Sequence, residues 1–327
     1  MGPRGTRRRA GPLLRRTRRL RDGLRHRPPL LRGSSRRARG VSPRAALAEA
    51  LGIPAERLRF EPLGGGCINQ AARVRGAGEP LFVKWNQHSL PGQFEAEARG
   101  LKAMADSGTS LTIPRPRAWS DAPGSSFLAL EFLSSGRRGP DFDEALGRGL
   151  AELHRATSPR GFGFEVDGAC GATPQPNGWL DDWARFYGER RLGHQLRLAA
   201  RRGFSREGLA LGERVLCRLP ELLGDPEPPA LIHGDLWSGN LHVTGAGAPA
   251  LVDPAAYYGH REAELGMMVL FGGFGPRVFA AYDEAFPLQP GWRDRLDLYS
   301  LYHVLNHYNL FGGGYEAQAV RLLRRYA

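Results

Sequence analysis

Three oxygen-bearing side chains are spaced along one segment of the sequence in a pattern that suits phosphoryl transfer. Asp235 follows an apolar run within HGDLWSGN, Asn240 comes five residues later, and Asp253 ends a second apolar run, PALVD. Residues 241–252 between them predict a β-hairpin, which would fold Asp253 back beside Asn240. One carboxylate could then accept or orient an attacking hydroxyl, while the other hard oxygen donors hold Mg²⁺ against the phosphates of ATP.

A lysine in an apolar run is the second chemical signal. The chain has 44 arginines but only two lysines, and Lys84 lies inside PLFVKWNQ, where a cation is costly to bury without a partner. The helix predicted over 91–108 offers Glu95 and Glu97. At about 100° per residue, Glu97 lies about 60° from the apolar stripe of this helix and Glu95 about 100° from it on the other side. We therefore expect Glu97 to pair with Lys84, which would contact nucleotide phosphates; the alternative is a surface lysine.

A run of glycines, Gly64, Gly65 and Gly66, stands between two predicted strands upstream of Lys84. Consecutive glycines let backbone N–H groups approach phosphate oxygens, although they also suit a plain hairpin turn. Cys67 follows directly. If it is exposed near a field that attracts phosphate, its thiol could ionise and be oxidised reversibly; the alternative is a small packing residue.

The elements that must position these residues change type along the chain. Residues 42–51 predict a short helix, with Ser42 as its N-cap and Pro43 at the first helical position. Strands are predicted within 58–86, 113–120 and 126–134, and the only helix among them is 91–108.

Helices are predicted to dominate the remainder, over 143–157, 179–203 and 207–223. Early strands and late helices indicate an α+β fold with two lobes. We expect a leader at 1–40, a nucleotide-binding N-terminal lobe at 41–130, a hinge at 131–136, and a catalytic and substrate-binding C-terminal lobe at 137–327.

The positive charge of the chain is confined to its beginning. Residues 1–40 hold fifteen arginines and one acid, whereas the rest carries 31 basic and 32 acidic residues. The Arg-rich, nearly acid-free leader is typical of an organellar transit peptide, although it has only two serines. The alternatives are a basic arm or a translated upstream region. A near-neutral body argues against nucleic acid as its partner.

The lengths of the apolar runs and the spacing of the cysteines indicate in which cellular compartment the protein works. No run approaches the roughly 18 apolar residues of a membrane span, and no apolar segment marks a secretory signal. The three cysteines, Cys67, Cys170 and Cys217, form no C-x-x-C pair, which suits a reducing compartment. We expect a soluble intracellular protein without membrane partners, in a plastid or mitochondrion if the leader directs it there and in the cytoplasm otherwise.

Several motifs together resemble the fructosamine kinase family, also called ketosamine-3-kinases. They are HGDLWSGN, DPAAYYGHREAEL, GGGCIN, FEAEARGL and the terminal LNHYNLFGGGYEAQAVRLL, and the resemblance covers about residues 42–327. It implies a bilobal protein-kinase-like fold with a small antiparallel sheet and one main helix in the N-terminal lobe. It also implies ATP-dependent phosphorylation of the sugar 3-hydroxyl on glycated amines, followed by elimination that frees the amine and repairs glycated protein.

By motif position, the resemblance assigns roles to the residues singled out above. Asp235 would be the catalytic base, and Asn240 and Asp253 would bind Mg²⁺. Lys84 would contact the phosphates of ATP, held by Glu97.

The resemblance also implies roles outside that set. The backbone of Glu131, Phe132 and Leu133 would hydrogen-bond adenine. Trp237 would line the sugar pocket, with buried packing as the alternative. A loop cysteine in GGGCIN supports a redox role for Cys67, and the protein would be a monomer or a Cys67-linked dimer that acts on glycated proteins or glycated lysine.

Two residues depart from the family pattern, and other functions remain open. Glu264 and Gly266 stand where the family commonly has Asp and Ala; the longer carboxylate could still support the catalytic loop but shift it. The alternatives are a kinase for an aminoglycoside, choline or homoserine, an inactive nucleotide-binding protein, or a nucleic-acid-binding module driven by the leader.

Overall fold

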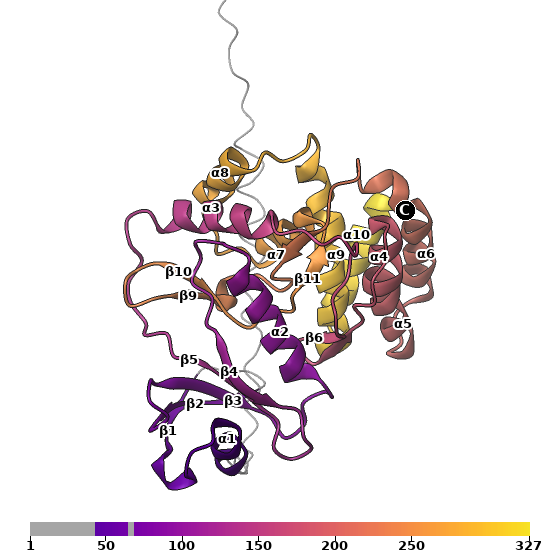
Figure 1. The fold of residues 1–327 in the computed structure, drawn as a ribbon. Helices are drawn as coiled ribbons and strands as arrows, with labels where there is room; N and C mark the ends of the chain where they lie inside the picture. The colour runs from indigo at the N-terminus through magenta and orange to yellow at the C-terminus, as the bar shows by residue number, and fades with distance from the viewer. Residues whose placement is uncertain (1–42, 65–68) are drawn as a thin grey trace, which may run out of the picture. The chain divides into compact units, whose positions relative to one another are not determined.

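The computed structural model describes residues 43–64 and 69–327, which lie in one compact unit. An antiparallel sheet forms its N-terminal part, with strands in the order β1-β2-β3-β5-β4 (Figure 1). These strands are β1 (Arg59–Leu63), β2 (Gln70–Arg75), β3 (Leu81–Trp85), β4 (Pro116–Ser120) and β5 (Phe127–Glu131). The strands predicted from the sequence are therefore confirmed. The predicted hinge, 131–136, begins at the last residue of β5, and its function as a hinge stays a prediction.

Side-chain alternation gives the sheet two different faces. On β5, Phe127 and Ala129 pack into a small core with Leu47 of α1 (Arg44–Leu51), while Leu128 and Leu130 belong to the main core. Strand β3 follows the same rule, since Val83 and Trp85 join the small core. Lys84 lies between those two residues and opposite Leu128, so it faces the side of the sheet where the main core lies.

Helix α2 (Gln93–Asp106) covers that second face. Phe94, Ala98 and Leu101 are buried as the apolar stripe predicts, and Met104 joins them. Its first turn is capped from a distance, because the Asp121 carboxylate accepts hydrogen bonds from the backbone N–H groups of Phe94 (3.0 Å) and Glu95 (2.8 Å). The start of α2 is thus tied to the loop between β4 and β5.

The first helix begins one residue later than predicted. Pro43 precedes α1, and its carbonyl accepts the first helical hydrogen bond, from Leu47 (2.8 Å). Without an N–H, proline can occupy either this position or the first helical turn at little cost. The predicted cap, Ser42, lies outside the described residues. Gly52, with φ of 65°, ends the helix in the left-handed conformation.

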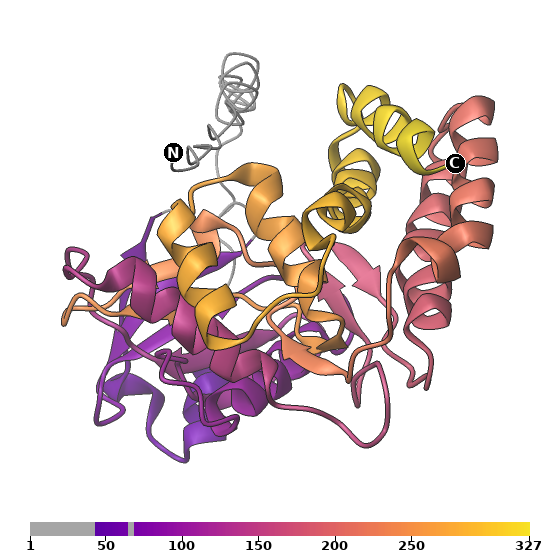
Figure 2. The same cartoon turned by 90° about the horizontal axis from the view of Figure 1, so that it is seen from above.

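The C-terminal part is mostly helical, and Figure 2 shows its last helices, in yellow, beside α6. Short β-pairs lie among the helices, β6 with β7, β8 with β11 and β9 with β10. Its elements are α3 (Phe142–His154), β6 (Gly168–Cys170), β7 (Thr173–Gln175), α4 (Trp183–Phe186), α5 (Gly193–Arg201), α6 (Arg206–Leu222), β8 (Ala230–Ile232), β9 (Leu241–Val243), β10 (Pro249–Leu251), β11 (Tyr257–Gly259), α7 (Arg261–Phe271), α8 (Pro276–Ala285), α9 (Trp292–Phe311) and α10 (Tyr315–Tyr326).

The helix predicted over 179–203 is shorter and less regular than expected. It begins at Trp183, where the Asp182 side chain caps it, and it contains a π-helical stretch over Tyr187–Leu192 between α4 and α5. That stretch carries the buried Arg191, whose guanidinium carbon lies 3.8 Å from the centroid of the Tyr257 ring. Inward-facing residues that break the 3.6-residue period are typical of π-bulges. An α-helical sequence pattern does not reveal them.

The hairpin predicted between Asn240 and Asp253 is confirmed as β9 and β10, which are paired from Leu241–Leu251 to Val243–Pro249. None of the helices in the described part of the chain combines the length and apolar character needed to cross a membrane.

The long-range cap of α2 leads to a stability prediction. Asp121→Ala should lower the free energy of unfolding by about 1 kcal/mol, because two N–H groups of the first turn lose their acceptor. Asp121→Asn keeps one acceptor oxygen and should lose less. Chemical denaturation of the three proteins measures the difference. Equal stability of the alanine variant and the wild type would show that α2 does not need this cap.

Candidate active site

The loop after β8 carries Asp235 to the wall of a cleft of about 710 Å³ between the sheet and the helical part. Lys84, Asp253 and Trp237 line the same cleft. The Asp235 side chain is 21% exposed, and that of Asp253 is 52% exposed. The structure therefore brings together residues that are far apart in the sequence and that the motif spacing predicted to meet.

His233 ties the two loops of the site to each other. Its Nε2 lies 2.9 Å from the Val252 carbonyl, and its Nδ1 accepts a hydrogen bond from the Asp235 N–H (3.3 Å). Burial lowers the pKa of His233, which favours the neutral ring that this pattern requires. The imidazole thus fixes the backbone at Asp235 relative to the residue that precedes Asp253.

Gly234 permits a turn that no larger residue could make here. Its φ is 81°, and a Cβ at this position would lie 2.2 Å from the Ala255 carbonyl oxygen. The two loops therefore pass in direct backbone contact. Both the turn and the close approach of the two loops therefore require glycine at this position.

Asp253 is the one non-glycine residue with positive φ (56°) in the described ranges, 43–64 and 69–327. A left-handed conformation costs a residue with a Cβ about 1–2 kcal/mol. Such strain persists only where the surroundings hold it. Here the Asn240 side-chain nitrogen donates to the Asp235 carbonyl (2.8 Å) and to the Asp253 carbonyl (3.4 Å), and the Val252 N–H donates to the Asn240 carbonyl (3.1 Å).

Lys84 bridges two carboxylates across the cleft. Its Nζ lies 2.6 Å from Glu97 and 2.6 Å from Asp253, so the ion pair predicted from the helix phase is present. Glu95, the residue not preferred, pairs instead with Arg99 on the surface. Burial alone would lower the pKa of Lys84, but Asp253 and Glu97 outweigh it and raise that pKa. The lysine therefore stays charged although it is buried.

The carboxylates of the site have displaced pKa values. Burial raises the pKa of Glu97 to about 7 against the opposing effect of Lys84. Lys84 lowers the pKa of Asp253, and this outweighs the effect of burial. Burial, followed by the neighbouring charges of Glu264 and Asp253, raises the pKa of Asp235 to about 8. Asp235 is thus the most basic of these carboxylates, as a proton acceptor at near-neutral pH should be.

Glu264 supports the loop that carries Asp235. Its buried carboxylate accepts hydrogen bonds from the backbone N–H groups of His233 and Gly234 (3.3 Å). Although burial would raise the pKa of Glu264, its neighbours His154 and His233 lower it, so the group remains an anionic acceptor. The expected support by a longer carboxylate is present in the structure.

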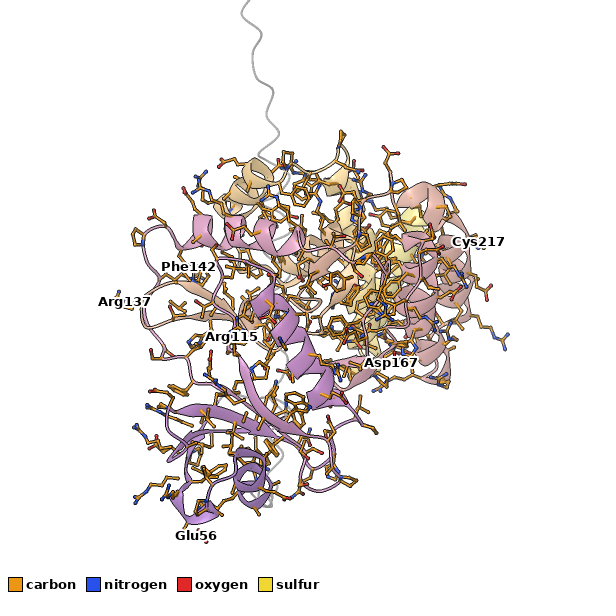
Figure 3. The ribbon with its side chains drawn as sticks, in the orientation of Figure 1. Glu56, Arg115, Arg137, Phe142, Asp167 and Cys217 are labelled. Carbon is orange, nitrogen blue, oxygen red and sulfur yellow. The ribbon has the colours of Figure 1, made fainter. Side chains whose placement is uncertain are left out.

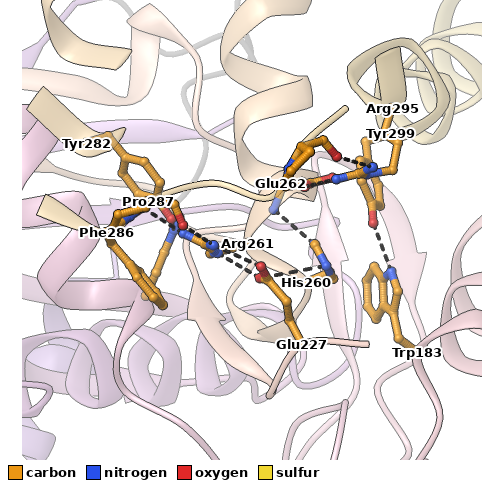
Figure 4. A network of polar contacts seen from close by, with 12 residues as sticks. Trp183, Glu227, His260, Arg261, Glu262, Tyr282, Phe286, Pro287, Arg295 and Tyr299 are labelled. Carbon is orange, nitrogen blue, oxygen red and sulfur yellow. Dashed lines mark hydrogen bonds and ion pairs between the residues drawn. The ribbon is translucent and has the colours of Figure 1, made fainter. Parts of the chain in front are cut away.

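Helix α7, which carries Glu264, is itself fixed by ion pairs at its first turn (Figure 4). Arg261 makes two hydrogen bonds to Glu227 (2.7 and 2.8 Å), just before β8. Glu262 receives two from Arg295 of α9 (2.7 and 2.6 Å). Bidentate pairs of this kind fix direction as well as distance. The sequence HREAEL therefore anchors a helix between its neighbours and presents Glu264 to the loop.

Gly266 allows α7 to pack closely on α9. A Cβ at this position would lie 2.7 Å from the Tyr299 Cβ, and the Ser300 hydroxyl donates to the Gly266 carbonyl (2.9 Å). Glu264 and Gly266 are two residues apart, so they face roughly opposite sides of the helix. Moving α7 closer to α9 moves it away from the loop, and a longer carboxylate reaches farther. We therefore expect Glu264 and Gly266, the two departures from the family pattern, to compensate for each other.

Three of the expected site residues, Gly65, Gly66 and Cys67, lie outside the described residues. Gly64 lines the cleft. Trp237 is 40% exposed, with its ring 6.5 Å from that of Phe271, so the alternative of a buried packing residue does not hold. Its contact with a sugar stays a prediction.

Sequence reasoning missed two residues beside Asp235. Cys170 on β6 and His303 on α9 lie close to its carboxylate. Neither stands in a motif with recognisable spacing, because β6 and α9 are brought together only by the tertiary fold. The single available signal was a cysteine outside any pair, and that signal is weak.

The compensation between Glu264 and Gly266 can be tested with a double-mutant cycle. Gly266→Ala should cost about 1–3 kcal/mol of stability through overpacking. Glu264→Asp should cost a similar amount, about 1–3 kcal/mol, by leaving buried N–H groups poorly paired. The double variant should lose less than the sum, because the displaced helix brings the shorter side chain nearer the loop.

Denaturation midpoints and slopes give the three free energies. The exposed Val269→Ala on the same helix, combined with Glu264→Asp, is the control and should be additive. Additivity in the Glu264–Gly266 pair as well would contradict the compensation.

Comparisons with known proteins agree with this geometry. The chain is 44% identical over 280 residues to the Synechocystis sp. protein named "Probable ketoamine kinase slr1563", covering 85% of this chain and 94% of that one. It is 45% identical over 267 residues to the chloroplastic protein-ribulosamine 3-kinase of Oryza sativa subsp. japonica, covering 81% and 77%. A crystal structure of a protein assigned as a fructosamine-3-kinase, from Thermobifida fusca, superimposes with a TM-score of 0.77 at 37% identity, covering 86% and 96%.

A more distant likeness concerns the fold alone. The aminoglycoside phosphotransferase APH(4)-Ia superimposes with a TM-score of 0.58 at 16% identity. The predicted α+β kinase-like fold is confirmed by these structures and by the antiparallel sheet. The family model described as fructosamine kinase matches residues 42–327. This chain belongs to the fructosamine kinase family.

Proposed function

We propose that the protein transfers the γ-phosphoryl group of ATP to the 3-hydroxyl of a ketosamine, the sugar adduct of a glycated amine. The observation that carries this proposal is the convergence of Lys84, Asp253 and Asp235 on one cleft. The relatives named for ketoamine and protein-bound ribulosamine supply the substrate class. The 3-phosphate would eliminate and free the amine, so the product of the reaction would be repaired protein.

Asp235 would act on the attacking hydroxyl. The hydroxyl oxygen forms a bond to the γ-phosphorus, the bond to the bridging oxygen breaks, and ADP leaves. The hydroxyl proton passes to the Asp235 carboxylate. A pKa raised to about 8 suits that acceptor, because proton transfer is most efficient when the pKa of the base lies near the working pH.

Lys84 would neutralise charge on the phosphates. It is shared between Asp253 and Glu97 in this structure, so Glu97 remains as its partner when Asp253 turns to other ligands. The buried ion pair thus supplies an ammonium group already oriented toward the cleft, and little reorganisation is required at the moment of reaction.

The donor set at Asn240 and Asp253 fits Mg²⁺. The Asn240 side-chain nitrogen is engaged by backbone carbonyls, which leaves the amide oxygen as a ligand, and only Oδ1 of Asp253 contacts Lys84. Both are hard oxygen donors of the kind that Mg²⁺ prefers. When bound, the ion would neutralise phosphate charge.

Adenine and sugar would occupy opposite ends of the cleft. Glu131, Phe132 and Leu133 line it. The Glu131 N–H already donates to the Arg115 carbonyl (3.1 Å) and the Phe132 N–H to the Pro80 carbonyl (3.2 Å). Adenine would therefore use the other backbone groups of these three residues. Trp237 would pack against the sugar, with the glycines at 64–66 over the phosphates.

Substitution of the proposed base gives the direct test. Asp235→Asn should lower phosphate transfer to ribulosyl-lysine and fructosyl-lysine about 10²–10⁴-fold, because the amide cannot accept the proton. Binding of Mg·ATP should persist, since Lys84, Asn240 and Asp253 are unchanged. Turnover by the variant equal to that of the wild type would remove Asp235 from this role. A wild-type preference for aminoglycosides, choline or homoserine would overturn the substrate class.

We also propose that residues 1–40 direct the protein to an organelle. The similarity to a chloroplastic relative and the confinement of positive charge to this segment support the proposal. Fusion of residues 1–40 to a fluorescent protein should give organellar fluorescence, and deletion of these residues should leave kinase activity unchanged. Diffuse fluorescence, or loss of activity on deletion, would contradict it. The redox role of Cys67 and a dimer linked through it stay predictions.

A further inference from the structure

Three side chains with metal-ligating atoms meet beneath the cleft. The Cys170 Sγ, an Asp235 carboxylate oxygen and a His303 ring nitrogen all lie within 4.8 Å of one another. They come from β6, from the loop after β8 and from α9, so only the folded chain assembles them. Two of the three, Cys170 and His303, have no part in the phosphoryl transfer proposed above.

His303 presents a buried nitrogen that the protein leaves unpaired. The residue is 4% exposed, and its Nδ1 has no hydrogen-bond partner among residues 43–64 and 69–327. The nearest carboxylate oxygen, Oδ1 of Asp235, is 3.8 Å away, beyond hydrogen-bond distance. Buried polar atoms are nearly always paired, so an unpaired one needs an explanation. Burial lowers the pKa of His303 to about 3, which keeps the ring neutral and able to donate a lone pair.

Cys170 is held in place as a ligand would be. It is 2% exposed, and the Asn306 side-chain nitrogen donates to its Sγ (3.4 Å) and to its carbonyl (3.3 Å). A hydrogen bond to sulfur stabilises a thiolate and orients it, as residues around metal centres commonly do. Burial raises the pKa of the free thiol, so without a metal this cysteine is an unreactive thiol.

We propose that Cys170, Asp235 and His303 form an inhibitory site for a thiophilic divalent cation of the Zn²⁺ type, whose fourth position opens to the cleft. A sulfur, an imidazole nitrogen and one carboxylate are the ligand set of Zn²⁺ and not of Mg²⁺. Tetrahedral Zn²⁺ with bonds of about 2.0–2.3 Å needs ligand atoms roughly 3.5 Å apart. Because the three ligand atoms lie within 4.8 Å of one another, they must approach by up to about 1.3 Å on binding. Binding releases the thiol proton, and that of Asp235 where it is protonated, to solvent.

Inhibition follows from the identity of the third ligand. This step rests on the proposed function, since the cation would occupy the carboxylate that accepts the hydroxyl proton. Lys84, Asn240 and Asp253 are left free, so Mg·ATP would still bind. Zn²⁺ should therefore compete with the sugar substrate and not with the nucleotide.

Metal binding is tested first, without nucleotide or substrate. Metal-free protein titrated with Co²⁺, a spectroscopic substitute for Zn²⁺, should bind one ion per chain with a sulfur-to-cobalt charge-transfer band. Cys170→Ser should lose the band. Cys217→Ser is the matched control, because Cys217 is an exposed residue of α6 at the outer surface (Figure 3), and it should keep the band, as should Cys67→Ser. No band, or a band that survives Cys170→Ser, would overturn the site.

Kinase assays in zinc buffers test the inhibition. His303→Asn and Cys170→Ser should raise the half-inhibitory Zn²⁺ concentration at least about tenfold, with chelation restoring wild-type activity. Equal sensitivity of the wild type and both variants would mean that Zn²⁺ acts on Mg·ATP, and would overturn the inhibitory role. The cobalt band does not depend on catalysis. Its presence in a protein inactive toward ketosamines would leave the metal site standing while the proposed function fails.

Discussion

The ammonium group of Lys84 is buried between two carboxylates, and this arrangement constrains both parts of the molecule. Removing such a charge from water costs several kcal/mol, which a single partner at imperfect distance does not recover. Both Glu97 and Asp253 must therefore be placed within hydrogen-bond distance, one from α2 and the other from the loop after β10. The alternation of β3 directs the lysine to the correct face, and the Asp121 cap fixes the start of the helix that carries Glu97. Interactions at the edge of the sheet thus determine the geometry at the centre of the cleft.

On the opposite wall of the cleft, the loop that carries Asp235 is positioned through its backbone. Gly234 lets the loop approach its neighbour closely, and Glu264 accepts the N–H groups that the turn leaves without partners. The helix that presents this buried anion is held to its neighbours by the ion pairs of Arg261 and Glu262. Asp235 needs no direct contact with α7 to be positioned by it. The segment HREAEL therefore supports the loop of the proposed base, although none of its residues lines the cleft.

The sequence predicts those parts of the site that local patterns determine. A lysine inside an apolar run and the phase of the following helix identify Lys84 and its partner Glu97, and the predicted hairpin brings Asp253 back to Asn240. The π-helical stretch around Arg191 could not be predicted, since its irregular period depends on tertiary packing. The same reason applies to the cluster below Asp235, because side chains from three distant elements have no sequence spacing in common. Local sequence patterns thus predict the sheet and the loops that carry Asp235 and Asp253. The buried residues that support these loops depend on contacts between distant segments.

Burial has two chemical effects on Asp235 that cannot be separated. Withdrawing the carboxylate from water raises its pKa to about 8 and makes it a stronger base. The buried surroundings must then be built from side chains that tolerate low polarity, and here they include a thiol and a neutral imidazole. Cysteine and histidine meet that requirement without adding charge, yet both have lone pairs that soft cations bind strongly. Burial raises the pKa of Asp235 although the Cys170 thiol itself lowers it by hydrogen bonding, and the same buried surroundings supply the ligands of the proposed metal site. Replacing either residue with a charged one would change the electrostatic field on which the basicity of Asp235 depends.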